Sequence, residues 1–344
     1  MALDLKNRIG AFTEAGKRIR NFSADPLLSE AVRSAATENP WFTADHIRHA
    51  LLAWGDLLDE RHLTEWLAPY RKRLEERQTP KTVGVVMAGN IPMVGFHDML
   101  CVLLSGNRLM AKLSSQDRQL LPAVAAILKE TGPGWDELIS FESGRMTGFD
   151  AVIATGSNNT SRYFEYYFGK YPHIIRKNRS SVAVLTGDET DDELRGLASD
   201  TFLYFGLGCR NVSKLFLPEG YDPGRLASPF SLFSGYYDHN KYRNNLDYHR
   251  SVFLVNQVPF YDGGFFLMRE DPSYASPVSV IHYEFYSDPQ WLEDRLSAEQ
   301  DALQCVVSAA GSGRSRVRPG ATQLPALADY ADGLDTMAFL TENI

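Results

Sequence analysis

The first 80 residues carry apolar side chains at helical spacing. One set is Leu5, Ile9, Phe12 and Ile19, and a second is Ile47, Leu51, Leu52 and Leu58. This period places each set on one face of a helix. Thr43 precedes the second set and is a typical residue for a helix start, because its hydroxyl can accept an unpaired backbone N–H. The pattern predicts a helical N-terminal segment, residues 1–80, packed on the domain that follows.

From residue 81 the pattern changes to short apolar runs that alternate with amphipathic stretches. Thr82–Ala88 is rich in β-branched residues and predicts a strand buried on both faces. The next predicted strands are Leu109–Lys112, Ile139–Phe141 and Ala151–Ala154, and the predicted helices are Val94–Leu104, Asp117–Lys129 and Thr160–Phe168. Because strands and helices alternate, we expect a doubly wound parallel sheet in residues 81–181.

A second series of strands and helices is predicted in residues 182–308. The strands are Val182–Leu185, Val212–Leu217, Ser251–Val255, Phe265–Arg269, Val278–Tyr286 and Gln304–Ser308, and the helices are Asp191–Phe205, Arg225–Phe233 and Pro289–Glu299. We expect residues 309–344 to form a tail in which Gly311–Pro325 is a loop.

Composition narrows the classes of protein that the chain can belong to. The net charge of the 344 residues is −8, without a block of like charges, which argues against nucleic acid as a partner. No apolar run reaches membrane-spanning length, so membrane insertion is not expected. Cys101, Cys209 and Cys305 lie far apart and give neither a disulfide framework nor a metal site. We therefore expect a reduced, cytoplasmic compartment.

Two short stretches carry candidate chemistry. Cys209 lies between the glycines Gly206 and Gly208 on one side and Arg210 on the other. Free backbone N–H groups and a nearby cation favour a reactive thiolate, although a small buried cysteine beside a turn is the alternative. Thr155-Gly156-Ser157 ends a predicted strand and begins a helix, which suits a pyrophosphate or serves only as a helix cap. No Gly-x-Gly-x-x-Gly motif precedes it.

From about Lys81 onward the chain resembles the LuxC-type acyl-CoA reductases of the aldehyde dehydrogenase superfamily. The residues that carry this resemblance are Gly89–Pro92, Ser105–Asn107, Lys112–Ser115, Ala154–Ser157 and Gly208-Cys209. The resemblance implies an α/β fold with two domains, each built on a doubly wound, mostly parallel sheet, plus the helical N-terminal segment. It makes 81–181 the dinucleotide-binding domain and 182–308 the catalytic domain. The tail 309–344 would return towards the cofactor domain or a partner subunit.

The resemblance also implies the roles of individual residues. Cys209 matches the nucleophile, and Asn90 matches the amide that stabilises the oxyanion, although a capping role in its Gly-Asn-x-Pro turn is the alternative. Lys112, Ser114 and Ser115, together with Thr155, Gly156 and Ser157, match the cofactor-binding positions. Ser115 stands where many NAD-dependent relatives have a glutamate. A serine does not repel a 2′-phosphate, so we expect NADP(H), with NAD as the alternative.

Two departures from the family pattern affect the expected reaction. Lys177–Ser180 contains no carboxylate where hydrolytic relatives have the glutamate that activates water. The expected reaction is therefore reduction of an acyl-CoA, or another acyl thioester, to an aldehyde through a thioester on Cys209. An acyl phosphate substrate and a non-catalytic acyl-binding subunit are the alternatives. Tyr274–Pro277 also lacks the glutamate that holds the nicotinamide ribose in relatives.

Some residues and partners stay unassigned at this stage. His97 could donate a proton to the leaving group or could simply be packed, and His239 and His249 receive no role. Arg176, Lys177 and Arg179 could meet phosphates or form a solvated basic turn. No metal is expected. A homo-oligomer and an acyl-transferring protein partner are both compatible with the sequence.

Overall fold

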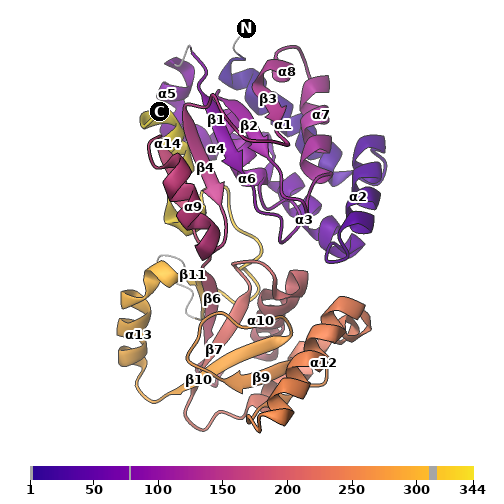
Figure 1. Ribbon diagram of the computed structural model, residues 1–344, viewed down its shortest axis with the longest axis vertical. Coiled ribbons are helices and arrows are strands. Elements are labelled where there is room, and N and C mark those ends of the chain that lie inside the picture. The colour runs from indigo at the N-terminus through magenta and orange to yellow at the C-terminus, as the bar shows by residue number, and fades with distance from the viewer. Residues whose placement is uncertain (1–2, 77–78, 310–315) are drawn as a thin grey trace. The chain divides into compact units, whose positions relative to one another are not determined.

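The chain divides into two compact units, whose ribbon is shown in Figure 1. This computed structural model describes residues 3–76, 79–309 and 316–344, so part of the expected loop Gly311–Pro325 lies outside the described residues. The first unit comprises Met1–Asn178 and Ala326–Ile344, and the second comprises Arg179–Pro325. Each unit has its own sheet and is described by itself.

The N-terminal part of the first unit is helical, as predicted. Its elements are α1 (Leu5–Arg20), α2 (Pro26–Glu38), α3 (Ala44–Leu57), α4 (Glu60–Leu67), the 3₁₀ turn η1 (Ala68–Tyr70) and α5 (Arg71–Glu76). The side chains of Asp4, Asp25, Thr43 and Asp59 each accept a backbone N–H at the start of one of the longer helices. These caps fix where the helices begin.

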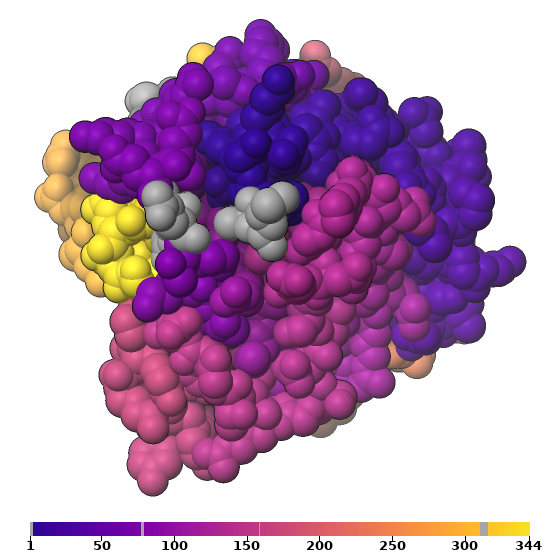
Figure 2. All heavy atoms as spheres, turned by 90° about the horizontal axis from the view of Figure 1, so that it is seen from above, coloured from indigo at the N-terminus to yellow at the C-terminus, as the bar shows by residue number. Residues whose placement is uncertain are grey.

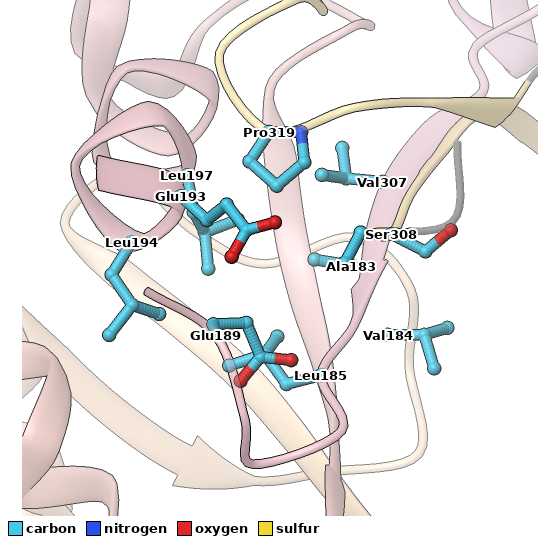
Figure 3. Close-up of a pocket in the computed structure, with 11 residues that line it drawn as sticks. Ala183, Val184, Leu185, Glu189, Glu193, Leu194, Leu197, Val307, Ser308 and Pro319 are labelled. Atoms are coloured by element: carbon cyan, nitrogen blue, oxygen red, sulfur yellow. The ribbon is translucent and has the colours of Figure 1, made fainter. Parts of the chain in front are cut away.

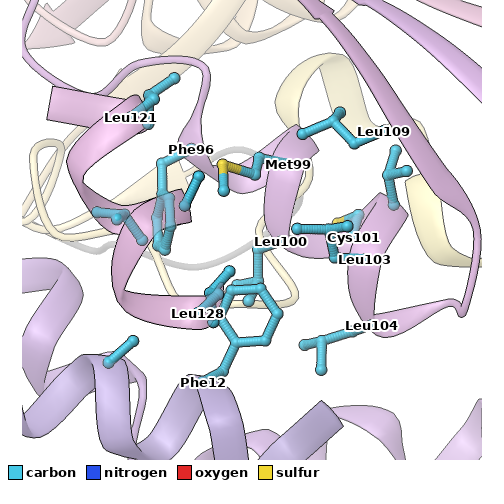
Figure 4. Close-up of a cluster of buried hydrophobic side chains, with 14 of the residues drawn as sticks. Phe12, Phe96, Met99, Leu100, Cys101, Leu103, Leu104, Leu109, Leu121 and Leu128 are labelled. Carbon is cyan, nitrogen blue, oxygen red and sulfur yellow. The ribbon is translucent and has the colours of Figure 1, made fainter. Parts of the chain in front are cut away.

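The core of the first unit joins these helices to the sheet. The Phe12 ring of α1 lies 6.0 Å from the Trp135 ring and 6.5 Å from the Phe96 ring, in edge-to-face arrangements. Figure 4 shows Phe12 facing the leucines of α6 (Phe96–Leu104) and α7 (Leu120–Glu130). The buried apolar face of the N-terminal segment therefore continues directly into the interior of the α/β layer.

The first sheet is fully parallel and has the strand order β3-β2-β1-β4-β5. Its strands are β1 (Thr82–Val86), β2 (Arg108–Lys112), β3 (Ile139–Phe141), β4 (Ala151–Thr155) and β5 (His173–Arg176). Besides α6 and α7, the connections contain α8 (Trp135–Leu138) and α9 (Asn158–Phe168). From β1 the order runs to β2 on one side and to β4 on the other, which is the doubly wound arrangement predicted.

Strand β5 was not predicted, because the sequence favoured a polar turn there. Arg176 lies at its end and is only 5% exposed. Its guanidinium donates to Asp98 Oδ2 at 2.6 Å and to Thr336 Oγ1 at 3.0 Å. A buried ion pair of this kind compensates for burying a charged residue in a strand. Arg176 is therefore part of the interior of the first unit.

The C-terminal residues complete the first unit. They contain η6 (Ala331–Gly333) and α14 (Thr336–Glu342). Tyr330 Oη accepts a hydrogen bond from Trp66 Nε1 at 2.8 Å, and Arg73 pairs with Glu342 at 2.7 Å. In Figure 2 the yellow C-terminal residues accordingly lie against purple residues from the N-terminal half of the chain.

The second unit contains a sheet of order β12-β11-β6-β7-β10-β9-β8. Its strands are β6 (Ser180–Val184), β7 (Val212–Pro218), β8 (Tyr261–Asp262), β9 (Leu267–Glu270), β10 (Val280–Tyr286), β11 (Leu303–Val307) and β12 (Arg316–Val317). Its larger helices are α10 (Asp191–Phe202), α12 (Asn240–Val255) and α13 (Pro289–Ala298), and shorter turns are η2 (Leu203–Gly206), η3 (Pro223–Leu226), α11 (Ala227–Phe230), η4 (Ser231–Asp238) and η5 (Gln300–Ala302). Only the β8–β9 pair is antiparallel among the strands described.

One predicted strand of the second unit is wrong. Ser251–Val255 forms the end of α12 instead of a strand. The buried side chains of this helix are Tyr242, Leu246 and Phe253, whose spacing places them on one helical face. His239 Nδ1 accepts the backbone N–H of Tyr242 at 3.3 Å and caps the start of the helix. The apolar run Val252–Val255 at the end of the helix made its helical spacing of buried residues hard to recognise in the sequence.

The predicted α/β class is confirmed: two mostly parallel sheets follow a helical N-terminal segment. Within the part of the chain that the structure describes, no helix combines the length and the apolar character that crossing a membrane requires.

Candidate active site

The first unit gathers the residues expected to bind cofactor, together with Asn90, at one edge of its sheet. Val86, the last residue of β1, is paired with Lys112 of β2 and with Ala154 of β4. Because the strands are parallel, the loops that follow them leave from the same carboxyl edge. Asn90, Leu113–Ser115 and Gly156-Ser157 lie in these loops, and Lys112 and Thr155 are the last residues of β2 and β4. Ligands of doubly wound sheets bind at this edge, where the strand order reverses.

The Asn90 turn is closely packed against the loop after β2. A Cβ on Gly89 would lie 2.4 Å from the Ser114 Cβ, so this position requires glycine. Met93 has a left-handed backbone (φ 59°), and its N–H donates to Asp117 Oδ2 at 2.8 Å. The Asn90 side chain itself is exposed. The turn therefore presents an amide to solvent from a tightly held backbone.

Asp117 is buried at 3% exposure, and burial raises the pKa of its carboxyl from 3.8 to about 6. The nearby N–H groups of Met93 and Leu120 oppose this shift by favouring the carboxylate. The folded protein thus holds the Asp117 proton more tightly than the unfolded chain does.

This shift predicts a pH dependence of stability. The contribution of Asp117 is fully present below about pH 4, and it should be lost as pH rises through about 6, at a cost of about 2–3 kcal/mol. We expect Asp117→Asn to lack this component. Urea unfolding of both proteins between about pH 4 and pH 7 measures the difference between their unfolding free energies. A difference that does not change with pH would contradict the prediction.

The cofactor-binding candidates have defined local roles. Lys112 Nζ donates to the carbonyl of Gly144 at 3.0 Å, and Ser114 Oγ accepts the N–H of Gln116 at 3.2 Å. Ser115 is exposed. Ser157 caps α9 by accepting the N–H of Thr160 at 3.2 Å. Gly156 is packed so closely that a Cβ would lie 2.8 Å from the Phe164 ring.

Cys209 lies in the second unit, in the turn between η2 and β7, and it is exposed. The backbone before it is unusual, because Tyr204, Phe205 and Gly206 have φ values of 57°, 58° and 73°. Left-handed backbone is costly for a residue other than glycine. Phe205 is buried with its ring 4.3 Å from that of Tyr236. This packing holds the strained turn that leads to the cysteine.

Two buried side chains fix the turn on either side of Cys209. Asn211 Oδ1 accepts the N–H of Gly208 at 2.8 Å, and its amide donates to the carbonyls of Asp200 at 3.0 Å and Leu203 at 2.9 Å. Ser181 Oγ of β6 donates to the carbonyl of Cys209 at 2.9 Å. The backbone of the cysteine is therefore held from α10 and from the sheet.

We expect Asn211→Ala to lower the free energy of unfolding by about 2–4 kcal/mol, because it leaves buried backbone groups without partners. Urea unfolding measures this loss. Asn245→Ala is the matched control, since the Asn245 amide donates to the Lys241 carbonyl on an exposed helix face. If both variants lose the same small amount, Asn211 is not the anchor of the turn.

Arg210, next to Cys209, is directed to a neighbouring segment of the second unit. Its Nε donates to the carbonyl of Thr322. Asp200 is fully buried and accepts the N–H of Gly320 at 2.7 Å and both the N–H and hydroxyl of Thr322, at 3.0 and 2.8 Å. Burial raises the pKa of the Asp200 carboxyl, and these bonds and Arg210 oppose the shift. Residues 320–322 are thereby tied to the cysteine turn.

The histidines singled out from the sequence lie in packed positions. His97 Nε2 lies 2.9 Å from the carbonyl oxygen of Leu327, and burial lowers the pKa of this imidazole. His239 caps α12 and stacks near Phe205. His249 is half-buried on α12, and burial lowers its pKa as well. Cys101 and Cys305 are buried, as expected.

A small cavity lies at the carboxyl ends of β6 and β11 in the second sheet. It is lined by Leu185, Glu189, Glu193 and Pro319, among others, which face one another in Figure 3. Its volume is about 10 Å³, enough for about one water molecule. It is too small for a nucleotide or an acyl group. The described residues also contain no cluster of three or more His, Cys, Asp or Glu side chains suited to a metal.

Sequence reasoning singled out Cys209 and Asn90 as candidates but missed the residues that hold their turns. Asn211 stands two positions after the cysteine, so the motif itself contained a signal for it. Asp117 and Ser181 carried no comparable signal, because their partners are distant in the sequence. Asn90 belongs to the first unit and Cys209 to the second, and each is held by contacts within its own unit.

The acyl-CoA reductase (LuxC) family model matches residues 14–222. No curated protein matches the sequence. The fold is similar to that of a Mycobacterium tuberculosis aldehyde dehydrogenase solved with NAD⁺ (15% identity, TM-score 0.60, 89% of this chain and 72% of that one). A Corynebacterium glutamicum NAD-dependent benzaldehyde dehydrogenase (14%, 0.63, 89% and 76%) and an Escherichia coli NADP-dependent enzyme (13%, 0.62, 89% and 73%) are also similar. At these identities the structural matches establish the fold alone.

Proposed function

The chain belongs to the acyl-CoA reductase (LuxC) family, and from this premise we propose that it reduces an acyl-CoA, or another acyl thioester, to an aldehyde through a thioester on Cys209. Family and fold together support an oxidoreductase with acyl-reductase or aldehyde-dehydrogenase chemistry and a nicotinamide cofactor. The acyl group reaches the cysteine from coenzyme A or from an acyl-transferring protein, and the same acyl-enzyme forms in both cases.

The observation that carries the proposal is the setting of Cys209. It is the exposed cysteine of the chain, and its carbonyl and the flanking N–H of Gly208 are held by Ser181 and Asn211. The thiolate attacks the thioester carbonyl carbon, the tetrahedral adduct collapses, and the carbon–sulfur bond to coenzyme A breaks. Coenzyme A leaves as a thiolate, which is a good leaving group and needs little help from an acid.

Asn90 is the proposed donor to the oxyanion of the tetrahedral adduct. A neutral amide stabilises developing negative charge without adding a charge that must itself be desolvated. The turn that presents it is fixed by Gly89 and Met93. Lys177–Ser180 offers no carboxylate to activate water, so we propose that the acyl-enzyme is hydrolysed slowly.

The carboxyl edge of the first sheet is the proposed cofactor site. The exposed Ser115 and the ammonium of Lys112 suit a phosphorylated adenosine ribose, and the start of α9 at Ser157 suits a pyrophosphate. When bound, NADPH supplies the hydride that reduces the acyl group. The thiohemiacetal left on Cys209 then breaks its carbon–sulfur bond and releases the aldehyde.

We expect Ser115→Glu to shift the preference from NADPH towards NADH. A carboxylate at this position repels the 2′-phosphate, and about 1.4 kcal/mol of repulsion raises the KM for NADPH about tenfold. Steady-state kinetics with both cofactors measure the ratio. Ser29→Glu, on the exposed face of α2, is the matched control. An unchanged ratio in Ser115→Glu would place the 2′ position elsewhere.

Substrate assays distinguish the proposal from its two rivals. We expect NADPH oxidation and coenzyme A release in equal amounts when acyl-CoA is supplied. Reduction of an acyl phosphate without reduction of any acyl-CoA would instead select an acyl phosphate reductase. Acyl binding without NADPH binding or turnover would select a non-catalytic acyl-binding subunit.

A further inference from the structure

The loop after β2 reaches across to the Asn90 turn through one buried carboxylate. Asp117 Oδ2 accepts the N–H of Met93 at 2.8 Å, a contact between residues 24 positions apart. Two further contacts join the same loops, because Gly89 lies against Ser114 and the N–H of Met87 donates to the Lys112 carbonyl at 3.0 Å. The Asn90 turn is thus held along its length by the segment 112–117.

Asp117 joins the start of α7 to a turn 24 residues earlier in the chain. Gln119 is the N-cap of α7, and that cap receives no side-chain hydrogen bond. Asp117 lies two residues earlier, and its carboxylate is favoured by the N–H of Leu120 at the start of α7 as well as by that of Met93, which donates to Oδ2. Its other oxygen, Oδ1, is buried and makes no hydrogen bond within the described part of the chain. Asp25, in contrast, uses one oxygen to cap its own helix through Leu27 and Leu28.

Met93 explains why the turn needs this support. Its φ of 59° is left-handed, which is unfavourable for a residue with a long side chain. The Met93 carbonyl then accepts the N–H of Phe96 at 2.9 Å as α6 begins. A hydrogen bond at the Met93 N–H opposes relaxation of the turn to an ordinary conformation. Such a relaxation would rotate the chain three residues after Asn90.

We propose that Asp117 is a positioning residue for Asn90: its bond to Met93 holds the turn in the conformation that aims the Asn90 amide at the reacting carbonyl. This inference rests on the proposed function, in which Asn90 stabilises the oxyanion. Asp117 does not touch the substrate, so its effect reaches the reaction only through Asn90. Its removal should slow acylation of Cys209 and leave NADPH affinity unchanged.

The test is a double-mutant cycle on the single-turnover rate of coenzyme A release. We expect Asp117→Ala to slow release about 10- to 100-fold. Asp117→Asn, which keeps an oxygen acceptor for Met93, should stay within a few-fold of wild type. The double variant Asn90→Ala, Asp117→Ala should be no slower than Asn90→Ala alone, because two residues that act through one step are not additive.

Asp25→Ala is the matched control, since Asp25 is also a buried aspartate that accepts backbone N–H groups. It should lower the melting temperature and leave coenzyme A release unchanged. If Asp117→Ala is not folded by circular dichroism, Asp117→Ser replaces it, because its shorter side chain cannot reach Met93.

Each contrary result has a distinct meaning. A wild-type rate in the Asp117 variant together with a slow Asn90→Ala overturns this inference and leaves the proposed function intact. A double variant slowed by the product of the two single effects also overturns it. A wild-type rate in Asn90→Ala removes the proposed role of Asn90, and the inference fails with it.

Discussion

Replacement of Cys209 by alanine should lower the rate of aldehyde formation by a factor of at least about 10³. The account assigns every covalent step to this thiol, and loss of an enzymic nucleophile leaves only the contributions of binding and orientation. Both coenzyme A release and NADPH oxidation should stop together, because the acyl-enzyme precedes hydride transfer. Stopped-flow measurement of the two signals tests this.

Cys305→Ala is the matched control for Cys209→Ala. Cys305 lies in β11 of the same unit and is 1% exposed, so substrate does not reach it. We expect this variant to keep its activity and to lose only stability. Substantial aldehyde formation by Cys209→Ala, with Cys305→Ala equally active, would show that the nucleophile is not a cysteine of this turn.

Replacement of Asn90 by alanine should slow acylation of Cys209 by about 10²–10³, the usual effect of removing one oxyanion donor. The KM for acyl-CoA should change little, since the amide acts on the tetrahedral adduct and not on the bound substrate. Asn90→Asp should be slower still, because a carboxylate beside the oxyanion repels it. Single-turnover coenzyme A release at saturating acyl-CoA isolates this step.

Asn21→Ala is a suitable control for Asn90→Ala. Asn21 is exposed at the end of α1, where its amide donates to the carbonyl of Lys17 at 3.0 Å. Its loss should leave acylation unchanged. A rise in the KM for acyl-CoA with an unchanged single-turnover rate would instead make Asn90 a substrate-binding residue. If neither quantity changes, Asn90 only caps its turn.

Local sequence patterns were sufficient to predict an element whose own residues are apolar enough to be buried. Thr82–Val86 is a β-branched run between turn residues, and it forms the central strand β1. β5 could not be found in this way, because Arg176 is tolerated in a buried strand only through Asp98, 78 residues away. The apolar run in Ser251–Val255 predicts a strand, but burial of one face of α12 stabilises a helix there instead.

The same limit applies to the candidate site. Motif order was enough to single out Cys209 and Asn90, since glycine turns and a helix start mark the loops that carry them. The left-handed backbone of Tyr204 and Phe205 had no signal, because aromatic residues rarely adopt it. It depends on the ring packing around Phe205, which arises only when α12 and η4 are folded. Asp117 and Ser181 were hidden for a similar reason.

Intact-protein mass spectrometry after mixing with acyl-CoA in the absence of NADPH tests the central claim most directly. The account predicts a mass increase of one acyl group per chain, located by peptide mapping on Cys209, with one equivalent of coenzyme A released. The adduct should persist in water and should disappear as aldehyde when NADPH is added. An unmodified chain that nevertheless forms aldehyde on full turnover, or an acyl group mapped to another residue, would contradict the account.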